Sequence, residues 1–206
     1  MAKKKTTKTV KAKKAVKKKK PAAKKTAKKA ATLIKVKRPI KNEGNMPIRL
    51  DIAGELKVGS MAPNFSMLSS DGRQVTLPGL RGKRVVLYFY PKDMTGGCTI
   101  EANEFTELAK KFTAGGTLVY GVSPDSIESH MKFIGKEGIA FPLLSDEGHK
   151  VAEMFGVWVK KSMYGREYMG IERSTFVIGL DGKLEAVYRK VSAPGHALCV
   201  LSDIGK

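Results

Sequence analysis

The chain has 206 residues, of which 42% are apolar, and it carries a formal net charge of +20. This length suffices for one globular domain of ordinary size together with an additional segment. With only two cysteines, the chain does not resemble a small secreted domain held by disulfides. It also lacks the apolar run of about 18 residues that a transmembrane helix needs, and its N-terminus lacks the apolar core of a secretory signal. We therefore expect an intracellular protein.

The positive charge is concentrated at the N-terminus. Residues 1–41 contain 18 Lys, one Arg and no acidic residue, whereas residues 42–206 hold 20 basic and 19 acidic residues. A segment with so few large apolar side chains cannot bury enough surface to offset the entropy cost of ordering. We predict a disordered polybasic tail at 1–41, a linker at 42–55 and a folded domain at 56–206.

Strand and helix patterns alternate along the folded domain. Apolar and aromatic runs such as RVVLYFY predict strands covered on both faces, and apolar residues at helical spacing predict amphipathic helices. Gly and Asp-Gly mark the turns between them. In chain order we predict a hairpin of strands at 65–68 and 74–77, a strand at 84–90, a helix through 102–112, a strand at 118–122, a helix at 126–138, a short helix at 151–155, a hairpin of strands at 174–180 and 183–190, and a closing helix at 196–204.

This order of elements is typical of a thioredoxin-like fold. In that α/β fold a central mixed sheet is flanked by helices, and here the disordered basic tail precedes it. In the helix at 126–138 we expect Ile127, Met131 and Ile134 to share one apolar face, because their spacing follows the helical period.

Cys98 occupies a position suited to nucleophilic chemistry. It follows a buried strand and a short Gly-rich loop, at the start of an amphipathic helix. Unpaired backbone N–H groups and the helix dipole favour a thiolate there, and the thiolate is the nucleophilic form. An isolated cysteine is more often a small buried apolar residue, but this position favours a reactive thiol.

The stretch YFYPKDMTGGCTIE resembles the active site of peroxiredoxins, and specifically their bacterioferritin-comigratory-protein (PrxQ) branch, whose pattern is YFYPKD-x-T-P-G-C-T-x-E. Further segments resemble the same branch in the same order: LKVGSMAPNFSML, FPLLSDEGHKVAEMFGVW and GIERSTFVIGLDGKL. Together they cover residues 56–204, which is most of the predicted domain. The resemblance implies a thiol-specific peroxidase.

The resemblance assigns roles to individual residues. Cys98 would be the peroxidatic cysteine, which peroxide oxidises to a sulfenic acid. Thr95 would hydrogen-bond the peroxide and the sulfur, and Pro91 would shield the thiolate from bulk water. Arg173 would supply a fixed positive charge for the thiolate and for the O–O bond as it breaks. Glu101 would be a structural or tuning partner.

Two departures from the family pattern affect the expected mechanism. Gly96 stands where the family has proline, which should leave the loop before Cys98 less rigid. Asn103 occupies the position at which many members of the branch carry a resolving cysteine. A one-cysteine cycle with an external thiol, a disulfide to Cys199 and a disulfide between chains therefore remain open, and we favour a passive Cys199.

The resemblance also sets the expected partners. Hydrogen peroxide or alkyl hydroperoxides would be the substrates, and thioredoxin or another thiol donor would be the reductant. We expect no cofactor and no metal, since the chain lacks a dinucleotide fingerprint and metal-ligand spacing. A monomer or weak dimer is expected. The alternative function is that of a DNA-associated, histone-like protein whose peroxiredoxin domain is a redox sensor or an inactive scaffold.

The tail resembles the Lys/Ala-rich arms of histone-like proteins. A flexible polycation binds polyanions by releasing their counterions, with little sequence preference, so we expect DNA or another polyanion as its partner. The location would be the cytoplasm and nucleoid in a bacterium, or the nucleus in a eukaryote, where KKKKP would also serve as an import signal. The expected polyanion contacts are Lys17, Lys18, Lys19, Lys20, Lys24, Lys25, Lys28 and Lys29.

Overall fold

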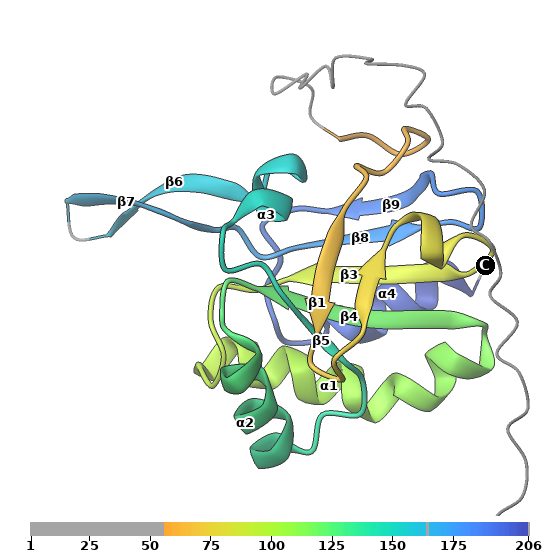
Figure 1. Ribbon diagram of the computed structural model, residues 1–206, viewed down its shortest axis with the longest axis horizontal. Helices are drawn as coiled ribbons and strands as arrows, with labels where there is room; N and C mark the ends of the chain where they lie inside the picture. Colours follow the sequence, from red (N-terminus) through yellow and green to blue (C-terminus); the bar gives the residue numbers. More distant parts are fainter. Residues whose placement is uncertain (1–55, 164, 206) are drawn as a thin grey trace, which may run out of the picture. The chain divides into compact units, whose positions relative to one another are not determined.

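A computed structural model describes residues 56–163 and 165–205. The predicted tail and linker, with the tail lysines named above, lie outside these residues. In chain order the elements are β1 (Ser66–Ser69), β2 (Gln74–Thr76), the short 3-10 helix η1 (Pro78–Leu80), β3 (Arg84–Phe89), α1 (Gly96–Ala114), β4 (Thr117–Ser123), α2 (Ile127–Glu137), β5 (Leu143–Ser145), α3 (Lys150–Met154), β6 (Trp158–Met163), β7 (Arg166–Ile171), β8 (Ser174–Ile178), β9 (Leu184–Tyr188) and α4 (His196–Ile204) (Figure 1).

The main sheet has seven strands in the order β2-β1-β5-β4-β3-β8-β9. It is mixed, because β3 runs parallel to β4 and antiparallel to β8. α1 forms the crossover between the parallel strands β3 and β4, and it packs against β4 and α4. Residues that follow the carboxyl end of a parallel strand are well placed to form a site, and the loop before α1 begins at the end of β3.

The central strand β3 is buried on both faces. Phe89 contacts Phe176 on one face, with ring centroids 5.8 Å apart, and that layer also holds α3. Tyr88 stacks on Phe105 on the opposite face, with ring centroids 4.7 Å apart. Residues of α1, α2 and α4 complete this second layer, and Cys98 belongs to it. The site is therefore anchored to the packed interior of the domain.

The predicted thioredoxin-like fold is confirmed. Both predicted hairpins are present, and the closing helix has the predicted bounds. β5 and the hairpin of β6 and β7 were not predicted from the sequence. These last two strands form a separate two-stranded sheet, which extends away from the main sheet (Figure 1).

The helix predicted at 126–138 is confirmed as α2. Of its predicted apolar face, Ile134 packs against the core, whereas Met131 does not. Ser126 caps its start by accepting a hydrogen bond from the backbone N–H of Ser129, and the left-handed Gly138 ends it. Met131, expected on the buried face, is 53% exposed, whereas His130 and Phe133 are fully buried. The apolar pattern did not predict the burial of His130, because that burial depends on a buried hydrogen-bond partner, Asp93, on another element.

Candidate active site

Cys98 lies in the first turn of α1 and is 2% exposed. The helix begins after Thr95, whose extended backbone, with φ of −92° and ψ of 148°, makes it the N-cap residue. Threonine at this position often caps the helix with its side chain. The side chain of Thr95 makes no such cap hydrogen bond. Its hydroxyl instead lies 2.9 Å from Cys98 Sγ and 3.0 Å from the carbonyl oxygen of Lys92.

The Thr95 hydroxyl can serve either protonation state of Cys98. A hydroxyl has one proton to donate and two lone pairs that accept. It can donate to the Lys92 carbonyl while accepting from a thiol, or it can donate to a thiolate. The contact therefore stays favourable when Cys98 loses its proton.

Arg173 approaches the sulfur from a distant part of the sequence. It lies between β7 and β8, and its Nη2 is 3.2 Å from Cys98 Sγ. Its Nη1 pairs with Glu101 Oε2, so one guanidinium contacts both the cysteine and the carboxylate. A cation at this distance stabilises a thiolate over a thiol. At Gly97 a Cβ atom would lie 3.4 Å from Arg173 Nη2, so glycine leaves room for this approach.

Glu101 supports the site from the same face of α1 as Cys98, because residues three apart are neighbours on a helix. It is fully buried. Burial raises the pKa of Glu101 to about 7, although the charge of Arg173 opposes the increase. Its second oxygen, Oε1, is buried without a hydrogen-bond partner among the described residues. Arg173 therefore offsets the energetic cost of burying the Glu101 carboxylate.

Pro91 lies two residues after the end of β3, half-buried, at the start of the loop that leads to Cys98. It has no N–H to donate, and the last strand-like hydrogen bond before it runs from Tyr90 N to Val122 O at 3.0 Å. The structure thus places Pro91 in the same loop as Thr95, seven residues before Cys98. The shielding role assigned to it stays a prediction.

The loop before Cys98 is held by a buried network that the sequence analysis missed. Asp93 accepts hydrogen bonds from Tyr90 Oη at 2.7 Å and Ser129 Oγ at 2.7 Å, and it lies 2.9 Å from His130 Nδ1. Its own N–H donates to Asp125 Oδ2 at 2.8 Å. Burial raises the pKa of Asp93, but the hydrogen bonds from His130 and Tyr90 outweigh burial and hold the pKa below its usual value. This network ties the loop to α2.

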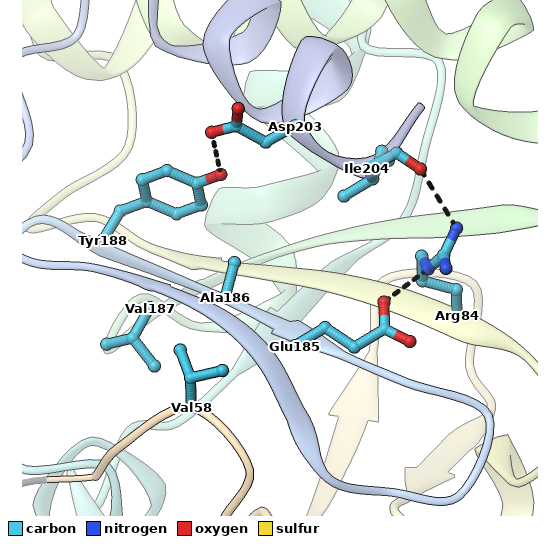
Figure 2. Close-up of a pocket in the computed structure, with 8 residues that line it drawn as sticks. All are labelled: Val58, Arg84, Glu185, Ala186, Val187, Tyr188, Asp203 and Ile204. Carbon is cyan, nitrogen blue, oxygen red and sulfur yellow. Dashed lines mark hydrogen bonds and ion pairs between the residues drawn. The ribbon is translucent and has the colours of Figure 1, made fainter. Parts of the chain in front are cut away.

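Cys199 has a very different environment. It is exposed on α4, and Asp203 Oδ2 lies 4.0 Å from its sulfur. The same carboxylate oxygen accepts a hydrogen bond from Tyr188 Oη at 2.8 Å, as Figure 2 shows for the pocket beside β9. Neither Cys98 nor any residue predicted to assist it lines that pocket. Both cysteines are free thiols.

Comparisons with known proteins agree with this geometry. Residues 58–187 match the AhpC/TSA family. A putative peroxiredoxin bcp of Helicobacter pylori is 46% identical over 150 residues, which cover 73% of this chain and 99% of the relative. Peroxiredoxin Bcp of Bacillus subtilis is 46% identical over 154 residues, covering 73% of this chain and 98% of the relative.

Solved structures give the same result. The bacterioferritin comigratory protein of Xanthomonas campestris, described for its alkyl peroxide reduction activity, is 40% identical, with a TM-score of 0.68 over 73% of this chain and 96% of that one. A cysteine-to-serine mutant of PrxQ from Xylella fastidiosa is 37% identical, with a TM-score of 0.70 over 74% and 97%. None of the helices in the described part of the chain is long and apolar enough to cross a membrane. The chain belongs to the AhpC/TSA family, within its Bcp/PrxQ peroxiredoxins, and is a thiol peroxidase.

Proposed function

We propose that Cys98 is the residue that reduces the peroxide. The Cys98 thiolate attacks the terminal oxygen of the hydroperoxide, so that an S–O bond forms as the O–O bond breaks. The sulfur is oxidised by two electrons to a sulfenic acid. The alkoxide or hydroxide that leaves takes a proton from solvent and departs as an alcohol or water. One observation carries this proposal: a single sulfur at the start of α1 is contacted by both the Thr95 hydroxyl and the Arg173 guanidinium.

Thr95 and Arg173 assist this step by stabilising charge. Arg173 stabilises the thiolate and then the negative charge that develops on the departing oxygen, and preorganised donors of this kind make large contributions to catalysis. Thr95 donates to the thiolate and orients the peroxide. Pro91 limits access of water to the sulfur from the other end of the loop.

Cys98 is restored in a one-cysteine cycle. A thiol of the reductant attacks the sulfenic sulfur and releases water, which leaves a mixed disulfide. A second thiol then attacks this disulfide, which frees Cys98 and oxidises the donor. Thioredoxin supplies both thiols in one molecule. The exposure of Cys199 and the carboxylate beside its sulfur support a passive role for that residue.

Hydrogen peroxide and organic hydroperoxides are the proposed substrates. The alkyl peroxide reduction described for the Xanthomonas campestris relative supports the organic class. Peroxide consumption by the full chain, with thioredoxin, thioredoxin reductase and NADPH, tests the proposal. We expect turnover with the wild type and with Cys199→Ser, and none with Cys98→Ser. Turnover that stops after one cycle in Cys199→Ser would contradict the one-cysteine cycle.

If the wild type consumes no peroxide, the domain is a sensor or a scaffold on a DNA-associated protein, as the alternative function holds. Formation of a sulfenic acid without turnover indicates the sensor. No reaction of Cys98 at all indicates the scaffold.

A second function is proposed for the tail, because residues 1–41 contain 19 basic residues and no acidic residue. The tail would hold the peroxidase, as a monomer or weak dimer, on DNA of a nucleoid or nucleus. Retention on duplex DNA should fall steeply with added salt and disappear when residues 1–41 are deleted. Retention that survives the deletion contradicts this role, and equal binding to polyphosphate or anionic vesicles would identify a general polyanion site.

A further inference from the structure

The structure points to a second arginine that sets the position of the first. We propose that Arg189, through Glu172, is the positioning residue for Arg173. The proposal rests on the function assigned to Arg173 above. It concerns the segment that follows β9, which contacts neither Cys98 nor Thr95 through any hydrogen bond of the described residues.

Arg173 lies two residues after the end of β7, and its guanidinium contacts the sulfur of Cys98. The β6–β7 hairpin enters from Val157 and leaves at Glu172, whose N–H donates to the Val157 carbonyl at 2.7 Å. Beyond this base the hairpin extends away from the main sheet (Figure 1), and its strand β7 is largely exposed. Arg173 therefore joins an exposed hairpin to the buried strand β8, whose first residue, Ser174, pairs with Phe89 of β3. On the side of the hairpin its backbone needs a further anchor.

Arg189 holds both ends of the hairpin base. Its Nε donates to Glu172 Oε1 at 2.7 Å on the exit side. On the entry side its Nη2 donates to the Gly156 carbonyl at 2.7 Å and its Nη1 to the Phe155 carbonyl at 3.3 Å. These carbonyls lie at the end of α3, where an arginine can satisfy groups the helix leaves unpaired. The planar fork of arginine is well suited to contact one carboxylate and two carbonyls in this way.

The backbone after Arg189 contacts Arg173 directly. Val191 N donates to the Arg173 carbonyl at 2.9 Å. Between them Lys190 has a φ of 49°, in the left-handed region, which costs a non-glycine residue roughly 1 kcal/mol or more. Such a conformation persists where the surrounding contacts determine it. Here it lets the Arg189 side chain reach Glu172 while Val191 reaches Arg173.

The two contacts fix Arg173 at the residue before it and at its own carbonyl. The Arg189–Glu172 pair holds the residue before it, and its side chains are only 29% and 12% exposed. The Val191 N–H holds its own carbonyl. A guanidinium 3.2 Å from a sulfur supports catalysis only while it stays in place, since a displacement of about 1 Å at a reacting group can cost about 100-fold in rate.

Arg84 provides a matched control for this clamp. It also donates Nε to a carboxylate, Glu185 Oε2 at 2.6 Å, and Nη1 to a carbonyl, Ile204 O at 3.3 Å, as drawn in Figure 2. Its side chain and that of Glu185 are 31% and 38% exposed. The pair joins β3 to β9 and α4, and none of its hydrogen bonds reaches a residue at either side of Arg173.

The test measures Cys98 oxidation in a single turnover, in full-length protein with Cys199→Ser. Each variant is treated with hydrogen peroxide and, separately, with iodoacetamide, and the ratio of the two rates is compared. Both reagents require an accessible thiolate, but only peroxide requires the guanidinium beside the departing oxygen. A purely structural role would lower thermal stability without changing this ratio.

We expect Arg189→Met to lower the ratio roughly tenfold or more, and Arg189→Lys to recover part of it. Arg84→Met should leave the ratio within twofold of the wild type at a similar loss of thermal stability. Glu172→Gln, which retains the shape of the side chain, replaces Arg189→Met if that variant does not fold. An unchanged ratio in Arg189→Met or Glu172→Gln, or an equal fall in Arg84→Met, overturns the proposal.

Arg173→Met separates the two claims. If it lowers the ratio while Arg189→Met and Glu172→Gln do not, the positioning role alone is wrong. If Arg173→Met itself leaves the ratio unchanged, the proposed role of Arg173 is wrong and the positioning role falls with it.

Discussion

The two cysteines of this chain occupy opposite environments. Cys98 is buried in the first turn of a helix, with a hydroxyl and a guanidinium within 3.2 Å of its sulfur. Cys199 is exposed within α4, and the carboxylate of Asp203 lies beside its sulfur. A cation and a donor stabilise a thiolate, whereas a carboxylate opposes it.

The contrast gives the two thiols different expected reactivity. Cys98 belongs to a buried layer, but the Thr95 hydroxyl and the Arg173 guanidinium contact its sulfur. Cys199 is exposed, with a carboxylate beside its sulfur. We expect the chemistry of Cys98 to depend on its neighbours, and changing each of them should make Cys98 behave more like Cys199.

Removing the cation should have the largest effect. Arg173→Met is expected to lower the rate of Cys98 oxidation by hydrogen peroxide by roughly 100-fold to 1,000-fold, because the loss of a preorganised charge-stabilising group typically has an effect of this size. Single-turnover kinetics measure this rate. A decrease of less than threefold would show that the contrast between the cysteines does not come from Arg173.

Removing the hydroxyl should have a somewhat smaller effect. Thr95→Val retains the shape of the side chain but cannot donate to Cys98, and we expect a loss of about 100-fold in the same rate. Thr95→Ser keeps the hydroxyl and serves as the control, with most of the rate retained. Equal rates in the two variants would place the importance of Thr95 in its methyl group or backbone instead.

The buried carboxylate beside Cys98 should be visible in the pH dependence of stability. The pKa of Glu101 is raised by burial from 4.5 to about 7, so the folded protein holds a proton that the unfolded chain releases between these values. The free energy of unfolding contributed by Glu101 is therefore full below about pH 4.5 and falls as the pH rises through about 7. The total change is at most about 3 kcal/mol.

Glu101→Gln removes this titration, so urea unfolding at several pH values should give a shallower decline than in the wild type. His196 acts in the opposite direction, because burial lowers its pKa from 6.5 to about 4. Its contribution is present in both proteins and cancels in the comparison. Parallel pH profiles would show that Glu101 ionises as an exposed carboxylate does.

Gly96→Pro should have the smallest effect, and it should be stabilising. Gly96 is the first residue of α1, where proline is favoured, and a Cβ atom there would meet nothing within 4 Å. The extended backbone of Thr95 suits a residue before proline. We expect a gain of about 0.4 to 1 kcal/mol in unfolding free energy with the peroxide rate retained. A loss of stability would show that the Gly96 N–H is needed.

Strong local patterns predicted much of the fold. The apolar run at 84–90 became β3, and the periodicity of 102–112 became part of α1. The three residues of β5 were too few to show a pattern, and the exposed strands β6 and β7 lack the alternation of a half-buried sheet. The burial of His130 in place of Met131 depends on Asp93, a partner on another element that periodicity does not reveal.

Contacts between residues far apart in the sequence also explain why the sequence indicated some site residues and not others. Cys98 stood out by its position before a helix, and the resemblance supplied Thr95, Pro91 and Arg173, which local patterns alone could not have linked. Glu172 lies in the segment GIERSTFVIGLDGKL, but the resemblance assigned it no role, and Arg189 lies outside the segments that resemble the branch. Their pairing follows from β8 and β9 lying side by side. A search for oppositely charged residues at the two ends of the predicted hairpin could have found them.

Hydrogen peroxide should distinguish the two thiols of this chain. The reduced wild-type protein is treated with one equivalent of hydrogen peroxide in the presence of dimedone, which traps sulfenic acids, and the labelled peptides are quantified by mass spectrometry. We expect the label on Cys98, with at most a trace on Cys199 and no disulfide between them. Label mainly on Cys199, or a Cys98–Cys199 disulfide as the main product, would contradict the proposed roles of the two cysteines.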